Sequence, residues 1–204
     1  MTAIVDYGVG NLFSLRSSLA AIGEDAIVTR NADELAAADR VILPGVGAFG
    51  DAAAKLREYG LDRAIVEIAA SGTPLLGICL GMQLLFERGF EFGEHVGLGL
   101  LTGEVRPIAD VIPAELKVPH IGWNALKLVG DSPLYRYTNE GEYVYFVHSF
   151  AAMDCGGCVS ATTDYGAPLT ASAERGNVFG TQYHPEKSGE VGMKILRAFC
   201  QLTK

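Results

Sequence analysis

The segment from Gly77 to Gly81 reads Gly-Ile-Cys-Leu-Gly and places one cysteine, Cys79, between two glycines. An apolar, strand-like run precedes it and a helical pattern follows it, which is the setting of a nucleophile elbow. Such an elbow exposes its side chain above the edge of a sheet, and the flanking glycines relieve crowding around the turn. The start of the following helix also favours the thiolate, the reactive form of cysteine. Cys79 is therefore either a thiol buried in the core or a nucleophile.

A second segment, Gln-Tyr-His-Pro-Glu-Lys-Ser at 182–188, supplies a base and a carboxylate. His184 and Glu186 are two residues apart, and side chains at i and i+2 of an extended chain point the same way. Glu186 can therefore orient the imidazole of His184, and His184 can act as a base toward Cys79. The other histidines have weaker cases: we expect His95, His120 and His148 to be structural, although the last two flank turns that could line a pocket.

Two further motifs, a glycine-rich loop and a pair of cysteines, are weaker evidence for nucleotide binding and for zinc binding. Gly45-x-Gly47-x-x-Gly50 has the spacing of a dinucleotide-binding loop, but the acidic residue expected about 20 residues later falls near Glu67, inside a helical pattern. Such a loop can instead present backbone N–H groups to an oxyanion. Cys155 and Cys158 have Cys-x-x-Cys spacing but lack the second pair that a structural zinc site needs. They lie in a glycine turn, where we expect two reduced thiols.

The elements that position these residues alternate in type over the first half of the chain. Short apolar runs predict strands at 2–7, 25–29, 40–44 and 73–78. Helical patterns separate them at 11–23, 32–38 and 51–70, and another helix is expected from Leu80 to about Phe86. Strands that alternate with helices in this way predict a parallel sheet with right-handed crossovers.

From about Gly103 onward the segments are strand-like and are separated by turn residues, until a last helix expected from about Val191 to Leu202. Some of these strands are expected to be antiparallel. We therefore expect a single α/β domain over residues 1–204, with a mostly parallel central sheet flanked by helices and extra antiparallel strands in the C-terminal half.

Composition restricts the class of partner and the compartment. The 204 residues carry a formal net charge of −8, which argues against nucleic acid or an anionic membrane as the main partner. No apolar run approaches about 20 residues, so no membrane span is expected. The N-terminus lacks the basic region and apolar stretch of a signal peptide. Four cysteines do not suggest a disulfide framework, so we expect a protein of the reducing cytoplasm.

The motifs at 77–83 and 184–188 resemble those of class I (triad-type) glutamine amidotransferases, and the resemblance covers essentially the whole chain. It implies a flavodoxin-like, three-layer fold. Within that family, further segments resemble the glutaminase subunits of imidazole glycerol phosphate synthase, an enzyme of histidine biosynthesis. They are Asp-Tyr-Gly-Val-Gly-Asn at 6–11, Leu-Pro-Gly-Val-Gly-Ala-Phe at 43–49, Val-Pro-His-Ile-Gly-Trp-Asn at 118–124 and Tyr-Phe-Val-His-Ser-Phe at 145–150.

The resemblance implies a reaction on the side-chain amide of L-glutamine. Cys79 would form a γ-glutamyl thioester, His184 would protonate the departing ammonia and then activate water, and Glu186 would hold the imidazole. The implied oxyanion and glutamine contacts are the backbone N–H groups of Leu80 and of Val46 or Gly47, the side chains of Gln83 and Glu91, and the backbone of Ser149 and Phe150. No cofactor and no metal are implied.

The implied partner is a (β/α)8 cyclase subunit in a heterodimer. Ammonia would pass to it through a protected channel and react with a phosphoribulosyl aminoimidazole-carboxamide. The products would be imidazole glycerol phosphate and aminoimidazole carboxamide ribotide. The positions that match the interface are Asn11, Trp123, Tyr145 and Lys187.

Three alternatives remain open at this point. Glutaminases of anthranilate or aminodeoxychorismate synthases would lack the segments at 6–11 and 119–124. A thiol hydrolase of another elbow type would not require Gln83 and Glu91. A non-catalytic regulatory module on the same fold would keep its biological activity without Cys79.

Overall fold

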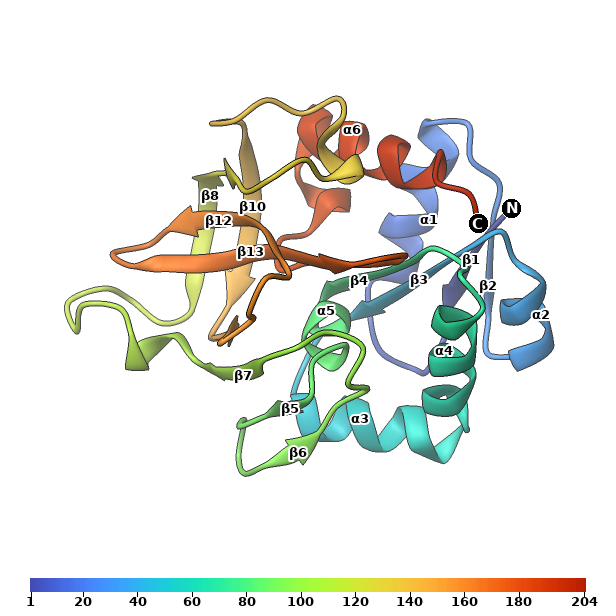
Figure 1. Cartoon of the computed structure of the whole chain (residues 1–204), viewed down its shortest axis with the longest axis horizontal. Coiled ribbons are helices and arrows are strands. Elements are labelled where there is room, and N and C mark those ends of the chain that lie inside the picture. The colour runs from blue at the N-terminus through green and yellow to red at the C-terminus, as the bar shows by residue number, and fades with distance from the viewer.

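The apolar strands of the first half form one side of an eight-stranded sheet in the computed structural model, which describes residues 1–204 (Figure 1). The strands lie in the order β2 (Ala26–Thr29), β1 (Thr2–Val5), β3 (Arg40–Gly45), β4 (Leu75–Cys79), β14 (Val178–Thr181), β13 (Pro168–Arg175), β12 (Val159–Asp164) and β9 (Lys127–Leu128). Neighbours from β2 to β14 pair in parallel, and β13, β12 and β9 extend the sheet with antiparallel pairs. The expected mostly parallel sheet with antiparallel strands in the C-terminal half is confirmed.

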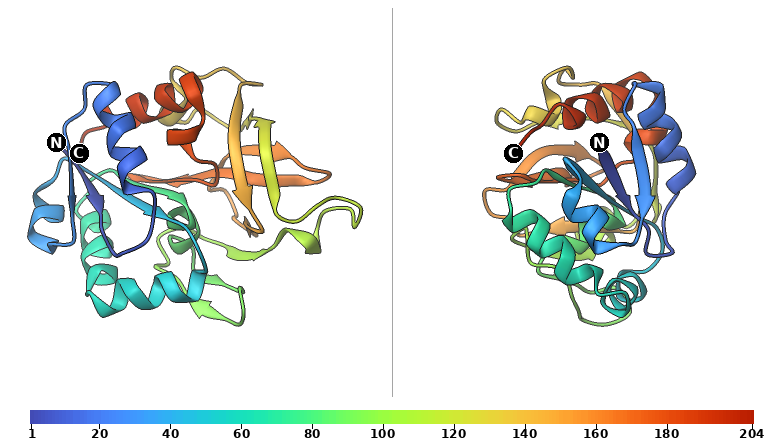
Figure 2. Two further views of the ribbon diagram at one scale, coloured as in Figure 1. Left: turned by 180° about the vertical axis from the view of Figure 1, so that it is seen from behind. Right: turned by 90° about the vertical axis from the view of Figure 1, so that its right-hand side faces the viewer.

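Helices cover both faces of this sheet (Figures 1 and 2). One layer contains α1 (Leu12–Ala21) and α6 (Gly189–Cys200), and the other contains α2 (Ala32–Ala37), α3 (Phe49–Glu58) and α4 (Leu61–Ala70). Successive strand residues face opposite layers: Ile4 packs with Leu15 and Phe199, whereas Val5 packs in the cluster that contains Phe49. Strands buried on both faces in this way are continuous apolar runs, which is why they are recognisable in the sequence.

Two smaller sheets complete the second half of the chain. β8 (His120–Ala125) and β10 (Tyr143–His148) form an antiparallel pair, and β11 (Phe150–Met153), β7 (Glu104–Pro107), β5 (Arg88–Gly89) and β6 (His95–Val96) form a four-stranded sheet. The short helix α5 (Leu80–Leu84) directly follows β4. Single 3-10 turns occur at Ile108–Asp110, Pro133–Tyr135 and Pro185–Lys187.

Some expected boundaries are wrong, each for a local reason. The helical stretch expected over 51–70 is two helices, because Gly60 lies between them with φ +68°, a conformation that ends a helix. Among the strand-like segments expected after Gly103, the apolar residues at 143–153 form two strands, β10 and β11, which divide at Ser149. The last helix begins at Gly189, two residues before the expected start. β5 and β6 were not expected, since two residues each are too few to produce a periodic pattern.

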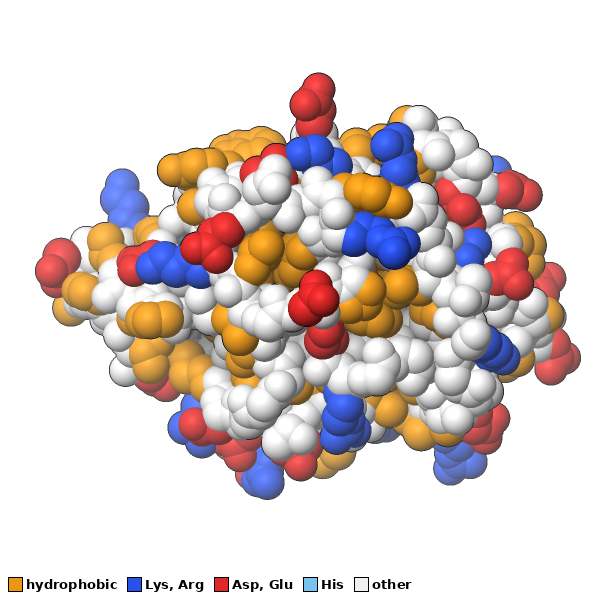
Figure 3. Space-filling model, turned by 45° about the horizontal axis from the view of Figure 1, so that its top comes forward, with side chains coloured by type: hydrophobic (Ala, Val, Ile, Leu, Met, Phe, Trp, Pro, Cys, Tyr) orange, Lys and Arg blue, Asp and Glu red, His pale blue; other side chains and the backbone are white.

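The chain ends are neighbours, and charged side chains of both signs are mixed on the surface (Figures 1 and 3). The two termini lie close together (Figures 1 and 2). On the face in Figure 3, acidic and basic side chains are interspersed with small hydrophobic patches, so the net charge is not gathered there into one acidic field. None of the helices combines the length and the apolar character that a membrane crossing requires.

Candidate active site

Cys79 is the last residue of β4 and comes directly before α5, in a backbone conformation of φ 55° and ψ −112°. A residue other than glycine rarely adopts a positive φ, so the turn is strained. The glycines on either side are required by close packing. A Cβ on Gly81 would lie 1.8 Å from the carbonyl oxygen of Leu43, and one on Gly77 would lie 2.6 Å from that of Gly81. Only glycine therefore lets α5 approach β3 and β4 closely enough to form the elbow.

The pairing of β14 with β4 brings the second motif to the elbow. The two strands run parallel with Thr181 opposite Ile78, so the chain leaves β14 beside the end of β4. His184 follows three residues later, and its backbone N–H donates to the carbonyl oxygen of Tyr145 at 3.0 Å. Cys79 and His184 line one pocket.

Glu186 holds the imidazole of His184 in a buried position. The Nδ1 of His184 lies 2.8 Å from Oε1 of Glu186, and the two side chains are only 3% and 4% exposed. With Nδ1 donating to the carboxylate, Nε2 is the nitrogen left for Cys79. The second carboxylate oxygen of Glu186 is buried and has no hydrogen-bond partner.

The charge of His184 is stabilised by both neighbours. Burial by itself lowers the pKa of His184, but its hydrogen bonds and charge interactions with Cys79 and Glu186 outweigh burial and raise that pKa to about 9. At neutral pH the imidazole is therefore protonated while it lies between the thiol and the carboxylate.

Most residues with expected roles line a single cavity of about 340 Å³. Those that line it are Val46, Gly47, Cys79, Leu80, Gln83, Glu91, Ser149, Phe150, His184 and Lys187. The structure thus brings the ends of β3, β4, β10 and β14 together with α5 and the loop around Glu91.

A glutamine that the sequence reasoning missed connects two of these residues. The side-chain amide of Gln83 donates to the carbonyl oxygen of Phe150 at 3.0 Å and to Oε1 of Gln182 at 2.9 Å. Nε2 of Gln182 in turn lies 3.7 Å from the sulfur of Cys79. Gln182 follows the end of β14 and lies two residues before His184 in the same motif, and that proximity was the signal available in the sequence.

Glu91 and Tyr7 fix the loop between β3 and α3. Oε2 of Glu91 accepts the backbone N–H of Phe49 at 2.8 Å, which satisfies a free donor at the start of α3. The hydroxyl of Tyr7 is buried and donates to the carbonyl oxygen of Pro44 at 2.8 Å. Between these two anchors, Gly47 has φ +95°, which favours glycine. The loop that carries the expected oxyanion donor is thus held at both ends.

His148 forms part of the pocket wall, as its place beside a turn allowed, and it also has structural contacts. Its Nδ1 lies 2.8 Å from the carbonyl oxygen of Phe150 and its Nε2 lies 3.0 Å from Nδ1 of His120. Burial lowers the pKa of His148 to about 4 and also lowers that of His120. Its bonds to the backbone and to His120 fit the expected structural role.

The four residues expected at a partner interface lie around the same pocket. Lys187 lines it, and Asn11 lies at a small hollow beside it. The carbonyl oxygen of Tyr145 accepts the backbone N–H of His184, and its ring packs edge-on against Trp123 with centroids 6.0 Å apart. Trp123 itself is 51% exposed. Lys187 thus lines the pocket, Asn11 the hollow beside it, and Tyr145 joins Trp123 to the backbone of His184.

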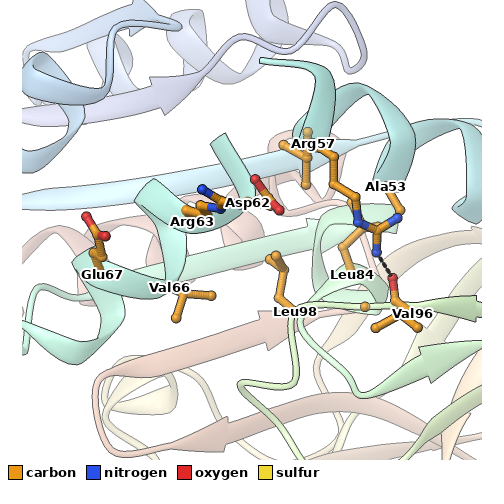
Figure 4. Close-up of a pocket in the computed structure, with 11 residues that line it drawn as sticks. Ala53, Arg57, Asp62, Arg63, Val66, Glu67, Leu84, Val96 and Leu98 are labelled. Atoms are coloured by element: carbon orange, nitrogen blue, oxygen red, sulfur yellow. Dashed lines mark hydrogen bonds between the residues drawn. The ribbon is translucent and has the colours of Figure 1, made fainter. Parts of the chain in front are cut away.

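Other features of the chain lie apart from this pocket. A cavity of about 300 Å³ lies between α3, α4 and residues 96–98, where Arg57 donates to the carbonyl oxygen of Val96 (Figure 4). No residue with an expected role lines it. Cys155 and Cys158 lie in the turn after β11 as free thiols. No group of three or more His, Cys, Asp or Glu side chains is placed to hold a metal ion.

Residues 3–202 match a family model described as glutamine amidotransferase class-I. The chain belongs to the class I glutamine amidotransferases. Curated relatives of this amidotransferase are each named imidazole glycerol phosphate synthase subunit HisH. The protein from Wolinella succinogenes is 48% identical over 99% of this chain and 100% of its own. The protein from Lactococcus lactis is 46% identical over 97% of this chain and 96% of its own. The protein from Rhodopirellula baltica is 48% identical over 98% of this chain and 97% of its own. Within the family, this amidotransferase is therefore similar in type to these HisH proteins.

Solved structures share the fold of this amidotransferase at lower identity. A crystal structure of a glutamine amidotransferase superposes with a TM-score of 0.76 at 21% identity and covers 98% of this chain and 97% of that one. PurLQS from Thermotoga maritima gives a TM-score of 0.77 at 23% identity, with coverage of 98% and 96%. These likenesses show the α/β fold of the class I amidotransferases. The HisH relatives indicate which members of that family the chain resembles in sequence.

Proposed function

We propose that this amidotransferase acts as a single domain over residues 1–204, hydrolyses L-glutamine to glutamate and ammonia at Cys79, and delivers the ammonia to a cyclase subunit. The observation that carries the proposal is the placement of His184 between Cys79 and the Glu186 carboxylate, with its pKa raised to about 9. A protonated imidazole beside a thiol supports a thiolate nucleophile and supplies a proton for a leaving group.

In the first half of the reaction the sulfur of Cys79 attacks the side-chain amide carbon of glutamine. The resulting oxyanion accepts hydrogen bonds from the N–H of Leu80, the first residue of α5, and from an N–H of Val46 or Gly47. His184 gives its proton to the amide nitrogen, the C–N bond breaks, and ammonia leaves a γ-glutamyl thioester. Loss of one oxyanion donor typically slows such reactions by about 10²–10³-fold.

In the second half, His184 takes a proton from water as that water attacks the thioester carbon. The C–S bond breaks, glutamate leaves, and the Cys79 thiolate beside the His184 imidazolium is restored. Glu186 stabilises the imidazolium throughout both halves of the reaction.

The α-amino and α-carboxylate end of glutamine binds away from the thiol, against Gln83, Glu91 and the backbone of Ser149 and Phe150. One carboxylate oxygen of Glu91 holds the start of α3, which leaves the other oxygen for the ammonium group of the substrate. Gln83 is held by Phe150 and Gln182, so its orientation is set before the substrate arrives.

The partner we propose is the (β/α)8 cyclase subunit, bound over the pocket entrance through Asn11, Trp123, Tyr145 and Lys187. Exposed Trp123 beside Tyr145 is the kind of aromatic group that anchors protein interfaces. Ammonia then passes from the pocket to the partner without release into water. We place the complex in the cytoplasm, to which the four free cysteines are suited.

Glutaminase assays with purified protein test the proposal. Glutamate release is measured alone and with the cyclase subunit carrying its nucleotide ligand, and we expect strong stimulation by the partner. Cys79→Ala and His184→Ala should each lower kcat by roughly 10⁴-fold, whereas Cys200→Ala, a control for loss of a thiol, should not. Full activity without the partner would contradict the subunit role, and retained hydrolysis in Cys79→Ala would contradict the mechanism.

A further inference from the structure

The turn Cys155-Gly-Gly-Cys158, between β11 and β12, has a geometry that the glutaminase reaction does not use. The backbone N–H of Cys158 donates to the carbonyl oxygen of Cys155 at 3.2 Å, and Gly156 has φ +58°. A turn with this hydrogen bond holds its first and fourth Cα atoms within about 7 Å of each other, and disulfides span about 4.4–6.8 Å between Cα atoms. The backbone therefore already holds the two cysteines at the separation that a disulfide needs.

The two thiols lie side by side in different surroundings. The thiol of Cys158 donates to the carbonyl oxygen of Thr102 at 3.6 Å, and the sulfur of Cys155 lies 3.8 Å from the hydroxyl of Thr170. Cys155 also lines a surface cavity of about 330 Å³, so a small reagent can approach the turn from the Cys155 side. Neither thiol lines the pocket that contains Cys79.

The pair is chemically asymmetric. A hydrogen bond from Cys155 lowers the pKa of the Cys158 thiol against the effect of burial, and Arg175 adds to the lowering. The same hydrogen bond, together with burial and the nearby Asp154 charge, raises the pKa of Cys155. A thiolate beside a protonated thiol is the arrangement that thiol–disulfide exchange requires.

We infer that Cys155 and Cys158 form a reversible thiol–disulfide site that reacts with small disulfides independently of Cys79. The Cys158 thiolate attacks one sulfur of the reagent and expels the other as a thiolate. The Cys155 thiol then loses its proton and attacks the Cys158 sulfur of this mixed disulfide, which expels the second half of the reagent. The protein loses two hydrogens, and the reagent gains them as two thiols.

Closure of so short a loop removes little entropy from the unfolded chain, so the disulfide stabilises the fold only weakly. A disulfide of this kind is more readily reduced than a structural one, which makes it reversible. Only the protonated form of Cys158 donates to the carbonyl oxygen of Thr102, so neither the thiolate nor the disulfide keeps this contact between the turn and the segment before β7.

The experiment uses the full chain, equilibrated at pH 7.5 with reduced and oxidised glutathione at a series of ratios. Remaining thiols are then alkylated and the tryptic peptides are weighed. Cys155 and Cys158 share the peptide 137–175, whereas Cys79 and Cys200 fall in 64–88 and 198–204. We expect peptide 137–175 to lose two hydrogens, reversibly, at ratios where the other two peptides are still alkylated. No such loss, a glutathione adduct that persists on 137–175, or earlier oxidation of 64–88 would overturn the inference.

Variants test the assigned roles of the two thiols. Cys155→Ser keeps a hydroxyl donor beside Cys158 and should trap one glutathione there, whereas Cys155→Ala lacks the donor and should react at least about threefold more slowly. Cys158→Ser should trap glutathione on Cys155 at least about tenfold more slowly than Cys155→Ser does. Equal rates in the two serine variants would overturn the assignment of Cys158 as the attacking thiolate. The measurement on the unmodified chain stands even where a variant folds poorly.

Discussion

The imidazole of His184 lies between two groups that stabilise its charge, and this governs the chemistry at the scale of single residues. Burial alone would remove the proton, yet Cys79 and Glu186 together hold the pKa at about 9. The protonated form is therefore retained through neutral pH. Gln182 adds a second polar contact to the sulfur and holds Gln83 as well.

A pH profile follows from the raised pKa of His184. In the proposed reaction the imidazolium is the acid that releases ammonia, so kcat/KM for glutamine should fall as the pH rises through about 9. Glu186→Gln removes a stabilising negative charge, so the midpoint of this alkaline limb should move to lower pH. Initial rates of glutamate formation between pH 6 and about 10.5, with the partner present, measure both midpoints. Identical midpoints in the two proteins would contradict the assigned role of Glu186.

At the scale of elements, the elbow depends on how closely α5 lies against β3 and β4. Gly77, Gly81 and Gly45 face backbone atoms that a Cβ would reach at 2.7 Å or less. These contacts hold Leu80 and its N–H at the end of β4. The parallel pairing of β14 with β4 then determines which later residues meet Cys79.

Two glycine substitutions distinguish the effect of close packing on stability from the effect of backbone conformation. Gly81→Ala places a methyl group 1.8 Å from the carbonyl oxygen of Leu43, and it should lower the unfolding free energy by roughly 3 kcal/mol or more. It should also abolish glutaminase activity, because α5 must shift. Gly23→Ala meets nothing within 4 Å although φ is +83°, so it should lower stability by about 1–2 kcal/mol and leave activity intact. Urea unfolding measures the stability of the two variants, and glutaminase assays below the melting range measure their activity. A Gly81→Ala protein as stable as Gly23→Ala would contradict the packing argument.

At the scale of the whole molecule, exposed apolar side chains occur beside the residues at the pocket entrance. Trp123 is 51% exposed, Ile121, two residues earlier on β8, is 58% exposed, and Phe13, two residues after Asn11, is 82% exposed. Exposed apolar groups of this size around a reactive pocket are typical of a surface that a partner covers. The interspersed charges on the face in Figure 3 give no comparable reason to expect a polyanion there.

Removal of the Trp123 ring tests this surface. Trp123→Ala should weaken binding of the cyclase subunit by about 2 kcal/mol, roughly 30-fold in Kd. The reason is that a tryptophan that becomes buried when a complex forms is a common interface anchor. Tyr59→Ala is the matched control, since Tyr59 is an exposed aromatic residue at the end of α3 in the opposite helix layer. Isothermal titration should give a Kd for Tyr59→Ala within about twofold of the unmodified protein. Equal weakening by both substitutions would contradict a specific interface at Trp123.

Local patterns in the sequence account for much of the fold and for part of the candidate site. Apolar runs such as β3 and β4 are recognisable because both faces are buried, and the Gly-x-Cys-x-Gly spacing indicates a turn whatever surrounds it. The boundary at Gly60 was missed because a single left-handed residue interrupts an otherwise continuous helical pattern. The role of Glu91 in holding the start of α3 was missed because it depends on a contact between residues 42 apart.

The sequence by itself determined which side chains are chemically capable: a thiol on a tight turn, and a histidine two residues from its carboxylate. The extended chain expected at the second motif is wrong, because Pro185–Lys187 forms a 3-10 turn, and His184 meets Glu186 across that turn. Only the tertiary structure decided that these two local arrangements meet. Gln182 and Cys79 are 103 residues apart, and they are neighbours because β14 pairs with β4 in parallel and in one register. Such pairing is selected by burial of the whole sheet between two helix layers, which no local periodicity records. The same reason explains why the contact of Gln182 with the sulfur of Cys79 was recognised only in the folded chain.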